Sequence, residues 1–354
     1  MKNKDAQHQD AQHQGAQHQD AQHQEIQRVL VIGSNSFSGS DFVDLLLEQG
    51  RYEVFGVSRS PEKSSLFLPY KNRDVKRFTF AQVDLNKDVE KLNQILDTFQ
   101  PEYIVNFAAQ SEVAPSWENP HHWFQTNAVA LTKLANLLKD KKFLKKYVHI
   151  SSPEVYGTCS GNVTEEAPLN PTTPYAASKA AGDLSLFTFF KNFSFPLVMV
   201  RATNVYGAYQ QLFKIIPRSI IYLKLGKKIE LHGGGHAVKS YIHIRDVSRG
   251  EMMAMENGRP GEIYHFSPDG GISVKDVVSK ICDKIGKGFT DSTIVVAERL
   301  GQDKAYVIDS SKAREEFGWK PLISIEEGIT GTVRWIDKNF KAIQKESLQY
   351  IHKE

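Results

Sequence analysis

Cysteine is scarce in this sequence: Cys159 and Cys282 are the only two among 354 residues. Two cysteines make no disulfide framework, and their spacing is not that of metal ligands, so the sequence predicts no metal site and a cytoplasmic protein. No apolar run approaches the ~18 residues that a membrane span needs. The N-terminus is polar throughout and lacks the apolar stretch of a secretory signal peptide.

An excess of charge of either sign is absent as well. The formal net charge is +3, with acidic and basic residues dispersed, which gives no electrostatic basis for binding nucleic acid or a membrane surface. The hydrophobic content of 40% and the charged content of 24% are those of an ordinary globular protein. A chain of 354 residues is long enough for two domains.

The first part of the chain also lacks apolar residues other than alanine. Residues 6–25 repeat a five-residue unit, Ala-Gln-His-Gln followed by Asp, Gly or Glu. Such a unit cannot bury a core, so we expect residues 1–25 to form a disordered tail outside the fold. The repeated histidines (His8, His13, His18 and His23) offer loose metal binding at most.

The ordered pattern begins at residue 28. Residues 28–32 form a short apolar run typical of a strand buried on both faces of a parallel sheet. A glycine-containing turn and an amphipathic helix follow, which is the setting of a phosphate-binding loop whose free amides face a pyrophosphate. Ser36 replaces the usual middle glycine. The predicted cofactor contacts here are Gly33, Ser36, Phe37, Ser38 and Gly39.

The ends of the next strands predict which dinucleotide binds. Ser58 and Arg59 follow a strand over 52–57, where an NAD site usually has an acidic residue. An arginine there suits a 2′-phosphate, so the sequence favours NADP over NAD. Asp84 and Leu85, after a strand over 78–83, are expected at the adenine. Ala108 and Ala109, after a strand over 103–107, are small enough to let the nicotinamide ribose approach the backbone. All six of these residues, from Ser58 to Ala109, are predicted cofactor contacts.

Strands alternate with helices along this half of the chain. Further strands are predicted over 147–152 and 196–200, and a helix over 127–138. This alternation predicts an α/β fold, a right-handed, doubly wound Rossmann parallel sheet, with a smaller C-terminal α/β domain for the substrate. The expected division is 26–203 for the dinucleotide domain, with a return segment near 240–267, and 204–354 mainly for the substrate domain.

The stretch from residue 146 to 179 carries the candidate chemistry. Tyr175 and Lys179 stand four apart, so on a helix both side chains project from one face. We expect the ammonium to lower the pKa of the phenol. Ser152, at the end of the preceding strand, would bring a hydroxyl to the pair. These groups together are equipped to take a proton from a sugar hydroxyl while a hydride leaves the same carbon.

Several motifs together resemble the extended short-chain dehydrogenase/reductase family, and within it the nucleotide-sugar 4,6-dehydratases of the dTDP-glucose and GDP-mannose types. The likeness spans residues 28 to about 337. The matching stretches are the turn at 33–39, Asn-Phe-Ala-Ala at 106–109, Ser-Ser at 151–152, Tyr-x-x-x-Lys at 175–179, and the stretches at 201–210, 299–303, 306–309 and 317–321.

The resemblance implies a role for each catalytic candidate. Tyr175 would deprotonate the sugar 4-hydroxyl, Lys179 would hold the nicotinamide ribose and stabilise the phenolate, and Ser152 would bond the 4-oxygen. Glu154 would remove the C5 proton, and the dinucleotide would be tightly bound and recycled. The family usually has an Asp before this Glu to protonate the leaving 6-hydroxyl. Here that position is Pro153, as in the GDP-mannose dehydratases, which also carry a non-acidic residue there; Glu154 would then handle both protons.

The resemblance also implies a substrate and an assembly. The substrate would be a nucleotide-diphosphate sugar, held by Ser111, Asn204, Lys214, Lys239 and Arg299. A homodimer would form through the helices that begin near residues 127 and 175. The second of these helices carries more apolar residues than one face needs: Leu184, Leu186, Phe187, Phe189 and Phe190.

Other reactions use the same groups. A 5-epimerase, a 5,6-dehydratase or a plain 4-oxidation all remain open because of Pro153. A 4-epimerase or 4-dehydrogenase needs no base at C5, so Glu154 argues against it. A non-enzymatic cofactor-binding relative is the remaining alternative, and the presence of Ser152, Tyr175 and Lys179 argues against that.

Overall fold

A parallel sheet forms the centre of the molecule. The computed structural model of the chain describes residues 25–298 and 305–353. Seven strands follow the order β12-β7-β5-β4-β1-β2-β3, and all neighbours are parallel. Their bounds are β1 (Gln27–Ile32), β2 (Tyr52–Ser58), β3 (Phe78–Gln82), β4 (Tyr103–Asn106), β5 (Lys146–Ile150), β7 (Leu197–Ala202) and β12 (Ile263–Phe266). The predicted Rossmann fold class is confirmed.

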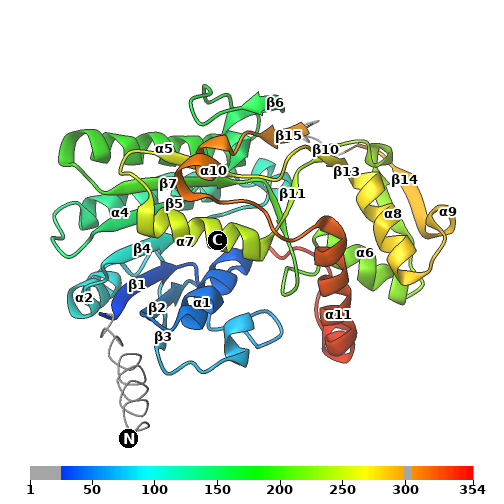
Figure 1. Cartoon of the computed structure of the whole chain (residues 1–354), viewed down its shortest axis with the longest axis horizontal. Coiled ribbons are helices and arrows are strands. Elements are labelled where there is room, and N and C mark those ends of the chain that lie inside the picture. Colours follow the sequence, from blue (N-terminus) through cyan, green and yellow to red (C-terminus); the bar gives the residue numbers. More distant parts are fainter. Residues whose placement is uncertain (1–24, 299–304, 354) are drawn as a thin grey trace, which may run out of the picture.

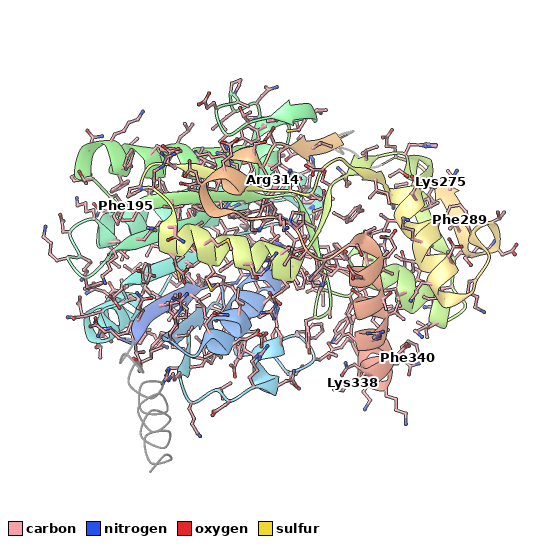
Figure 2. All side chains as sticks on the ribbon, in the orientation of Figure 1. Phe195, Lys275, Phe289, Arg314, Lys338 and Phe340 are labelled. Carbon is pink, nitrogen blue, oxygen red and sulfur yellow. The ribbon has the colours of Figure 1, made fainter. Side chains whose placement is uncertain are left out.

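Helices cover both faces of this sheet (Figure 1). Alternate residues of β1 point to opposite sides, because successive side chains of a strand alternate. Val29 and Val31 join one core cluster with α1 (Phe37–Gln49) and α7 (Ile244–Asn257). Leu30 and Ile32 join the other with α2 (Val89–Phe99), α4 (Leu131–Leu138) and α5 (Pro174–Phe193). Figure 2 shows side chains filling the space between sheet and helices.

The edge strand β12 and helix α7 come from far along the chain. Both lie in the segment near 240–267, after the chain has left the sheet at β7 and formed part of the second lobe. The helix predicted over 127–138 begins earlier than expected: α3 (Pro120–Phe124) continues through a π-helical turn, η3 (Gln125–Ala130), into α4. The domain boundaries themselves stay a prediction.

The second lobe is built from short strands and helices. Its core gathers apolar residues of α6 (Ile215–Lys224), α8 (Val274–Ile285) and α11 (Ile325–Ile343). The remaining elements of the described chain are β6 (Cys159–Val163), β8 (Asn204–Tyr206), β9 (Ile229–His232), β10 (Val238–Lys239), β11 (Tyr241–His243), β13 (Ile272–Ser273), β14 (Thr293–Val296), β15 (Ala305–Ile308), α9 (Phe289–Ser292), α10 (Ser311–Phe317), and the short helices η1 (Pro69–Asn72), η2 (Ala114–Trp117), η4 (Pro153–Tyr156) and η5 (Gly233–Gly235). Within the described ranges, no helix combines the length and the apolar character needed to cross a bilayer.

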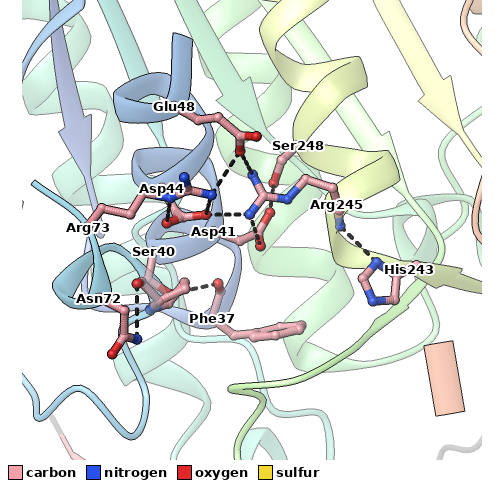
Figure 3. A network of polar contacts seen from close by, with 11 residues as sticks. Phe37, Ser40, Asp41, Asp44, Glu48, Asn72, Arg73, His243, Arg245 and Ser248 are labelled. Carbon is pink, nitrogen blue, oxygen red and sulfur yellow. Dashed lines mark hydrogen bonds and ion pairs between the residues drawn. The ribbon is translucent and has the colours of Figure 1, made fainter. Parts of the chain in front are cut away.

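A polar network ties α7 to α1, the helix that follows the glycine turn (Figure 3). Arg245 of α7 pairs with Asp44 of α1 and lies 3.3 Å from the carboxylate of Asp41. Ser248 Oγ donates to Asp41 at 2.8 Å. Arg73, just after η1, also bonds Asp44, with its Nε 2.5 Å from Oδ1. The network fixes α1 from two sides, and with it the turn that α1 begins.

Candidate active site

Two adjoining cavities open along the carboxyl ends of the sheet strands. The first has a volume of about 340 Å³ and is lined by residues that follow β1, β4, β5 and β7. The second has a volume of about 330 Å³ and is lined by residues that follow β1, β2, β3 and β4. Ser36, Phe107 and Ser111 line both. Ligands of doubly wound sheets bind at this edge, so the two cavities are the candidate site.

The glycine turn forms the floor between the cavities. Gly33 has φ +86°, and a Cβ there would lie 2.8 Å from the backbone nitrogen of Ala108. A Cβ on Gly39 would lie 2.4 Å from the carbonyl oxygen of Gly33, so only glycine lets α1 pack this closely on the turn. Ser36 caps α1, its Oγ accepting from Gly39 N at 2.9 Å. Phe37 and Ser38 line the first cavity.

The predicted adenosine contacts gather in the second cavity. Ser58, Arg59, Asp84, Leu85 and Ala108 all line it, and Ala109 lines both cavities. The side chain of Asp84 also stabilises its own turn, with Oδ1 accepting from Asn86 N at 2.9 Å. Lys63 and Lys353 line the same cavity. Neither lysine was predicted from the sequence, because both lie outside the strand-end positions that carry the family motifs.

The four catalytic candidates line the first cavity together: Ser152, Glu154, Tyr175 and Lys179. Pro174 is the first residue of α5, and Thr173 caps the helix by accepting from Ala176 N at 3.1 Å. This start places Tyr175 on the first turn, facing the end of β5. Ser152 caps η4 and hydrogen-bonds the Tyr175 side chain. The local sequence therefore brings the hydroxyl of Ser152, the carboxylate of Glu154 and the phenol of Tyr175 into the wall of one cavity.

The pKa of Tyr175 is raised, whereas the sequence predicted that Lys179 would lower it. Burial raises the pKa of Tyr175, and the nearby Glu154 carboxylate raises it further, while the hydrogen bond from Ser152 opposes both. The ammonium of Lys179 is bound by β5: Nζ donates to the carbonyl oxygen of Ile150 at 2.8 Å and lies 3.3 Å from Nε2 of His149. Burial also lowers the pKa of Lys179 to about 8.

A buried polar network holds this end of Lys179. Asp183, one helical turn beyond Lys179 on α5, accepts from Ser151 Oγ at 2.6 Å and from Arg201 Nη2 at 2.8 Å. His149 lies 3.6 Å from the same carboxylate, and burial lowers its pKa well below the ordinary value. A neutral His149 can accept the hydrogen bond from Lys179. The i, i+4 spacing of Lys179 and Asp183 was the signal in the sequence that could have revealed this network.

Three of the predicted substrate contacts line the cavities: Ser111, Asn204 and Lys214. Lys214 Nζ forms an ion pair with Glu112 at 2.6 Å. Lys239 is buried in β10 and is not among the residues that line either cavity. Arg299 lies outside the described residues. The two cationic contacts predicted at positions 239 and 299 therefore stay predictions.

Glu251 of α7 is a further acid in the wall of the first cavity. Its side chain is buried, and neither carboxylate oxygen has a hydrogen-bond partner within the described part of the chain. Burial raises its pKa well above the ordinary value, and the charge of Asp41 adds to the effect. Burial likewise raises the pKa of Asp41 to about 6. A raised pKa favours the neutral carboxyl group at this point of the wall.

The Glu251→Gln variant should therefore lose part of the pH dependence of stability. The folded protein holds the proton of Glu251 more tightly than the unfolded chain does, so stability is lost as pH rises above the ordinary glutamate value of 4.5. The glutamine variant should show a shallower fall, by up to about 1.4 kcal/mol per pH unit. Urea unfolding between pH 5 and pH 8, with Glu230→Gln as an exposed control, measures this. Parallel curves for wild type and Glu251→Gln would contradict it.

Comparison with known sequences points to one family. Residues 30–332 match the family model described as GDP-mannose 4,6 dehydratase. A dTDP-glucose 4,6-dehydratase of Xanthomonas campestris pv. campestris is 31% identical over 335 residues, covering 89% of this chain and 94% of the relative. A probable dTDP-glucose 4,6-dehydratase of Sinorhizobium fredii is 30% identical, covering 88% of this chain and 93% of the relative.

Solved structures lead to the same group. DesIV, a dTDP-glucose 4,6-dehydratase from Streptomyces venezuelae with NAD bound, superposes with a TM-score of 0.83 at 32% identity, covering 89% of this chain and 98% of that chain. A UDP-glucose 4-epimerase from Thermotoga maritima with UDP-glucose gives 0.80 at 26% identity, covering 88% and 99%. The chain therefore belongs to the GDP-mannose 4,6 dehydratase family, within the extended short-chain dehydrogenases/reductases.

Proposed function

We propose that this chain is a 4,6-dehydratase of a nucleotide-diphosphate hexose. The observation that carries the proposal is the meeting of Ser152, Glu154, Tyr175 and Lys179 in one cavity, beside a second cavity lined by the predicted adenosine contacts. When bound, the dinucleotide takes a hydride from C4 of the sugar and returns it at C6. The chain itself supplies the groups that move protons and orient the sugar.

Tyr175 is proposed to take the proton of the 4-hydroxyl. Its raised pKa means that the phenol keeps its proton unless a second charge helps, and Lys179 is the cation four residues away that can supply it. Ser152, already bonded to the Tyr175 side chain, can share a hydrogen bond with the 4-oxygen. Oxidation at C4 then makes the proton at C5 acidic.

Glu154 is proposed to handle both later protons. It takes the C5 proton as the bond to the 6-hydroxyl breaks, and it gives that proton to the departing oxygen, which leaves as water. When hydride returns to C6, Glu154 relays a proton from solvent to C5, and Tyr175 releases the proton of the 4-hydroxyl to solvent. Pro153 occupies the neighbouring position, and because proline has neither an ionisable side chain nor a backbone N–H it can supply no proton. The carboxylate of Glu154 lies close enough to Tyr175 to raise the pKa of the phenol, which places both groups around one small region of the cavity.

Asn204 and Lys214 are proposed to hold the diphosphate of the substrate. Both line the first cavity on the side of the second lobe. An amide and an ammonium are suitable donors for phosphate oxygens. Lys214 would exchange its ion pair with Glu112 for this contact, or share it between the two anions. Ser111, which lines both cavities, is proposed to contact the same ligand.

A 4-epimerase is the second candidate, because epimerases in complex with nucleotide sugars superpose well on this chain. A UDP-glucuronic acid 4-epimerase from Bacillus cereus, in complex with UDP-glucuronic acid and NAD, gives a TM-score of 0.80 at 25% identity. Glu154 discriminates between the two reactions, since epimerisation at C4 needs no base at C5.

Product mass tests the proposal. Purified protein is incubated with dTDP-, UDP-, GDP- and CDP-hexoses, and the products are analysed by mass spectrometry. Dehydration removes one water from the sugar, whereas epimerisation leaves the mass unchanged. An unchanged mass with an altered configuration at C4 would favour the epimerase. No change with any of the sugars would revive a non-enzymatic role.

We propose NADP, tightly bound and recycled in each cycle, as the cofactor. Arg59, Lys63 and Lys353 line one end of the second cavity, and cations there favour a ribose that carries a 2′-phosphate. Burial lowers the pKa of Lys63, and the charge of Lys353, which lines the same cavity, lowers it further. An additional anion would relieve this repulsion.

The Arg59→Ala variant should therefore bind NADP about tenfold more weakly, with a smaller loss for NAD. Fluorescence titration of both dinucleotides gives the ratio of the two dissociation constants. Arg218→Ala, on the surface-facing part of α6, is the matched control. A ratio equal to that of the wild type would contradict the role of Arg59 in choosing the dinucleotide.

We also propose a homodimer in the cytoplasm. Leu184, Val129 and Phe124 are exposed on α5, η3 and α3, which pack together. Exposed apolar residues on adjoining helices favour a covered surface. The other apolar residues of α5 contribute to the core. Leu186 is buried in the second core cluster, and Phe187, Phe189 and Phe190 pack against that cluster. Both cysteines are buried, and two cysteines make no disulfide framework, as suits a reducing compartment. Light scattering that gave the mass of one chain would contradict the dimer.

A further inference from the structure

The last described residues return from α11 to the second cavity. Leu348 packs against the core cluster of α6, α8 and α11. Beyond it, the ring of Tyr350 lies 5.5 Å from that of Phe213, at an interplanar angle of 77°. Residues 350–353, which we call the strap, therefore cross from the second lobe to the nucleotide-binding half.

His352 anchors the strap to α3. Its ring stacks on Trp123, with centroids 5.0 Å apart and an interplanar angle of 8°, and on His122, at 5.2 Å and 11°. Nδ1 of His122 and Nε2 of His352 lie 2.9 Å apart, and the Tyr350 hydroxyl lies 3.2 Å from the other ring nitrogen of His352. Trp123 is fully buried, so this anchor rests on the core and not on a loop.

The carbonyl oxygen of Lys353 is held by two side chains from neighbouring strand ends. Gln110, after β4, donates through Nε2 at 2.6 Å, and Arg59, after β2, donates through Nη1 at 3.2 Å. Gln110 is itself fixed by Asn127, whose amide exchanges two hydrogen bonds of 2.9 Å with its backbone. The strap is thus held at the ends of β2 and β4, where Arg59 and Gln110 line the second cavity.

The strap lines the second cavity without filling it. Tyr350, Ile351 and Lys353 are among its lining residues, and a volume of about 330 Å³ remains beside them. We propose that residues 350–353 form the outer wall of the dinucleotide site and slow release of the bound cofactor. The inference rests on the dinucleotide part of the proposed function and does not depend on dehydration. If the strap must detach before the adenosine end of the dinucleotide can leave, release of the cofactor is slow. This gives a physical basis for a cofactor that is retained through many cycles.

Cofactor release tests the strap directly. Protein loaded with reduced nicotinamide dinucleotide is mixed with an excess of the oxidised form, and the loss of bound fluorescence gives the release rate. Removal of residues 350–354 should raise this rate by about tenfold, and His352→Ala, which removes the stack on Trp123, by about threefold. Gln349→Ala, an exposed change in the same segment, should leave the rate unchanged.

Three results would overturn the inference. Release rates equal to the wild-type rate in both variants would show that the strap does not hold the cofactor. Tighter binding after removal of residues 350–354 would show that the segment competes with the dinucleotide. A wild-type protein that binds neither NAD nor NADP would refute the cofactor assignment together with the strap. If the shortened chain shows no cooperative melting transition and is therefore unfolded, the release rate of His352→Ala alone tests the inference.

Discussion

Tyr175→Phe is expected to lower turnover by about 10²- to 10⁴-fold, the range found for loss of a positioned general base. The change removes only a hydroxyl, and the ring of Tyr175 stays in its buried place on the first turn of α5. Without that hydroxyl no group at the same point can receive the proton of the sugar 4-hydroxyl, so the hydride cannot leave C4. Binding of the dinucleotide should change far less than turnover, because Lys179 and the glycine turn remain.

Single-turnover kinetics separate these effects. The rate at which reduced nicotinamide absorbance appears after mixing with substrate reports the C4 oxidation, and a titration reports cofactor binding. Tyr222→Phe on α6, which lines neither cavity, is the matched control and should match the wild type. Full activity of Tyr175→Phe would contradict the assignment of the base. A parallel loss of cofactor binding would instead indicate a structural role for the hydroxyl.

Glu154→Gln is expected to stop the reaction one step later. Glutamine keeps the shape of the side chain but cannot take the C5 proton, so formation of dehydrated product should fall by about 10²- to 10⁴-fold. The C4 oxidation needs only Tyr175, Lys179 and Ser152 and should continue. Reduced nicotinamide should therefore accumulate in the variant after substrate is added, whereas the wild type returns the hydride at once.

Isotope exchange sharpens this prediction. In deuterated water the wild type should place deuterium at C5 of the product, and the variant should leave C5 of recovered sugar unlabelled. Glu166→Gln, an exposed change in the loop after β6, is the control. Undiminished loss of water in Glu154→Gln would show that another group removes the proton. The Pro153→Asp variant, which adds the acid usual at this position, would then show whether a second carboxyl group speeds departure of the 6-hydroxyl.

The sequence was sufficient for features that depend on local spacing. Continuous apolar runs such as 28–32, each followed by a helix, predicted a parallel sheet because strands buried on both faces need no polar alternation. The glycines of the turn at 33–39 predicted a phosphate-binding loop, and the helix after it packs so closely that a Cβ on Gly39 would lie 2.4 Å from the carbonyl oxygen of Gly33. The spacing of Tyr175 and Lys179 predicted that both would face one cavity. In each case neighbours along the chain decide the outcome.

Features that depend on how distant segments meet escaped prediction. The ammonium of Lys179 is held by His149 and Ile150 on β5, thirty and twenty-nine residues away. The pKa of Tyr175 is raised and not lowered, because the fold buries the phenol and brings Glu154 near it. Glu251 looks like an ordinary helical glutamate until α7 returns to cover the sheet beside α1. The contact between Arg59 and Lys353 spans 294 residues, and no local pattern announces it.

The late return of α7 and β12 bears on when the protein can first bind its cofactor. A nascent chain emerges from the ribosome N-terminal end first. The turn at 33–39 is made early, yet Arg245 and Ser248, which hold the following helix, are made only after the first part of the second lobe, including α6. Until then, of the partners drawn in Figure 3, the carboxylates of α1 have Arg73 but neither Arg245 nor Ser248. Dinucleotide added to stalled chains should therefore protect them from proteolysis only once residue 266 has cleared the exit tunnel.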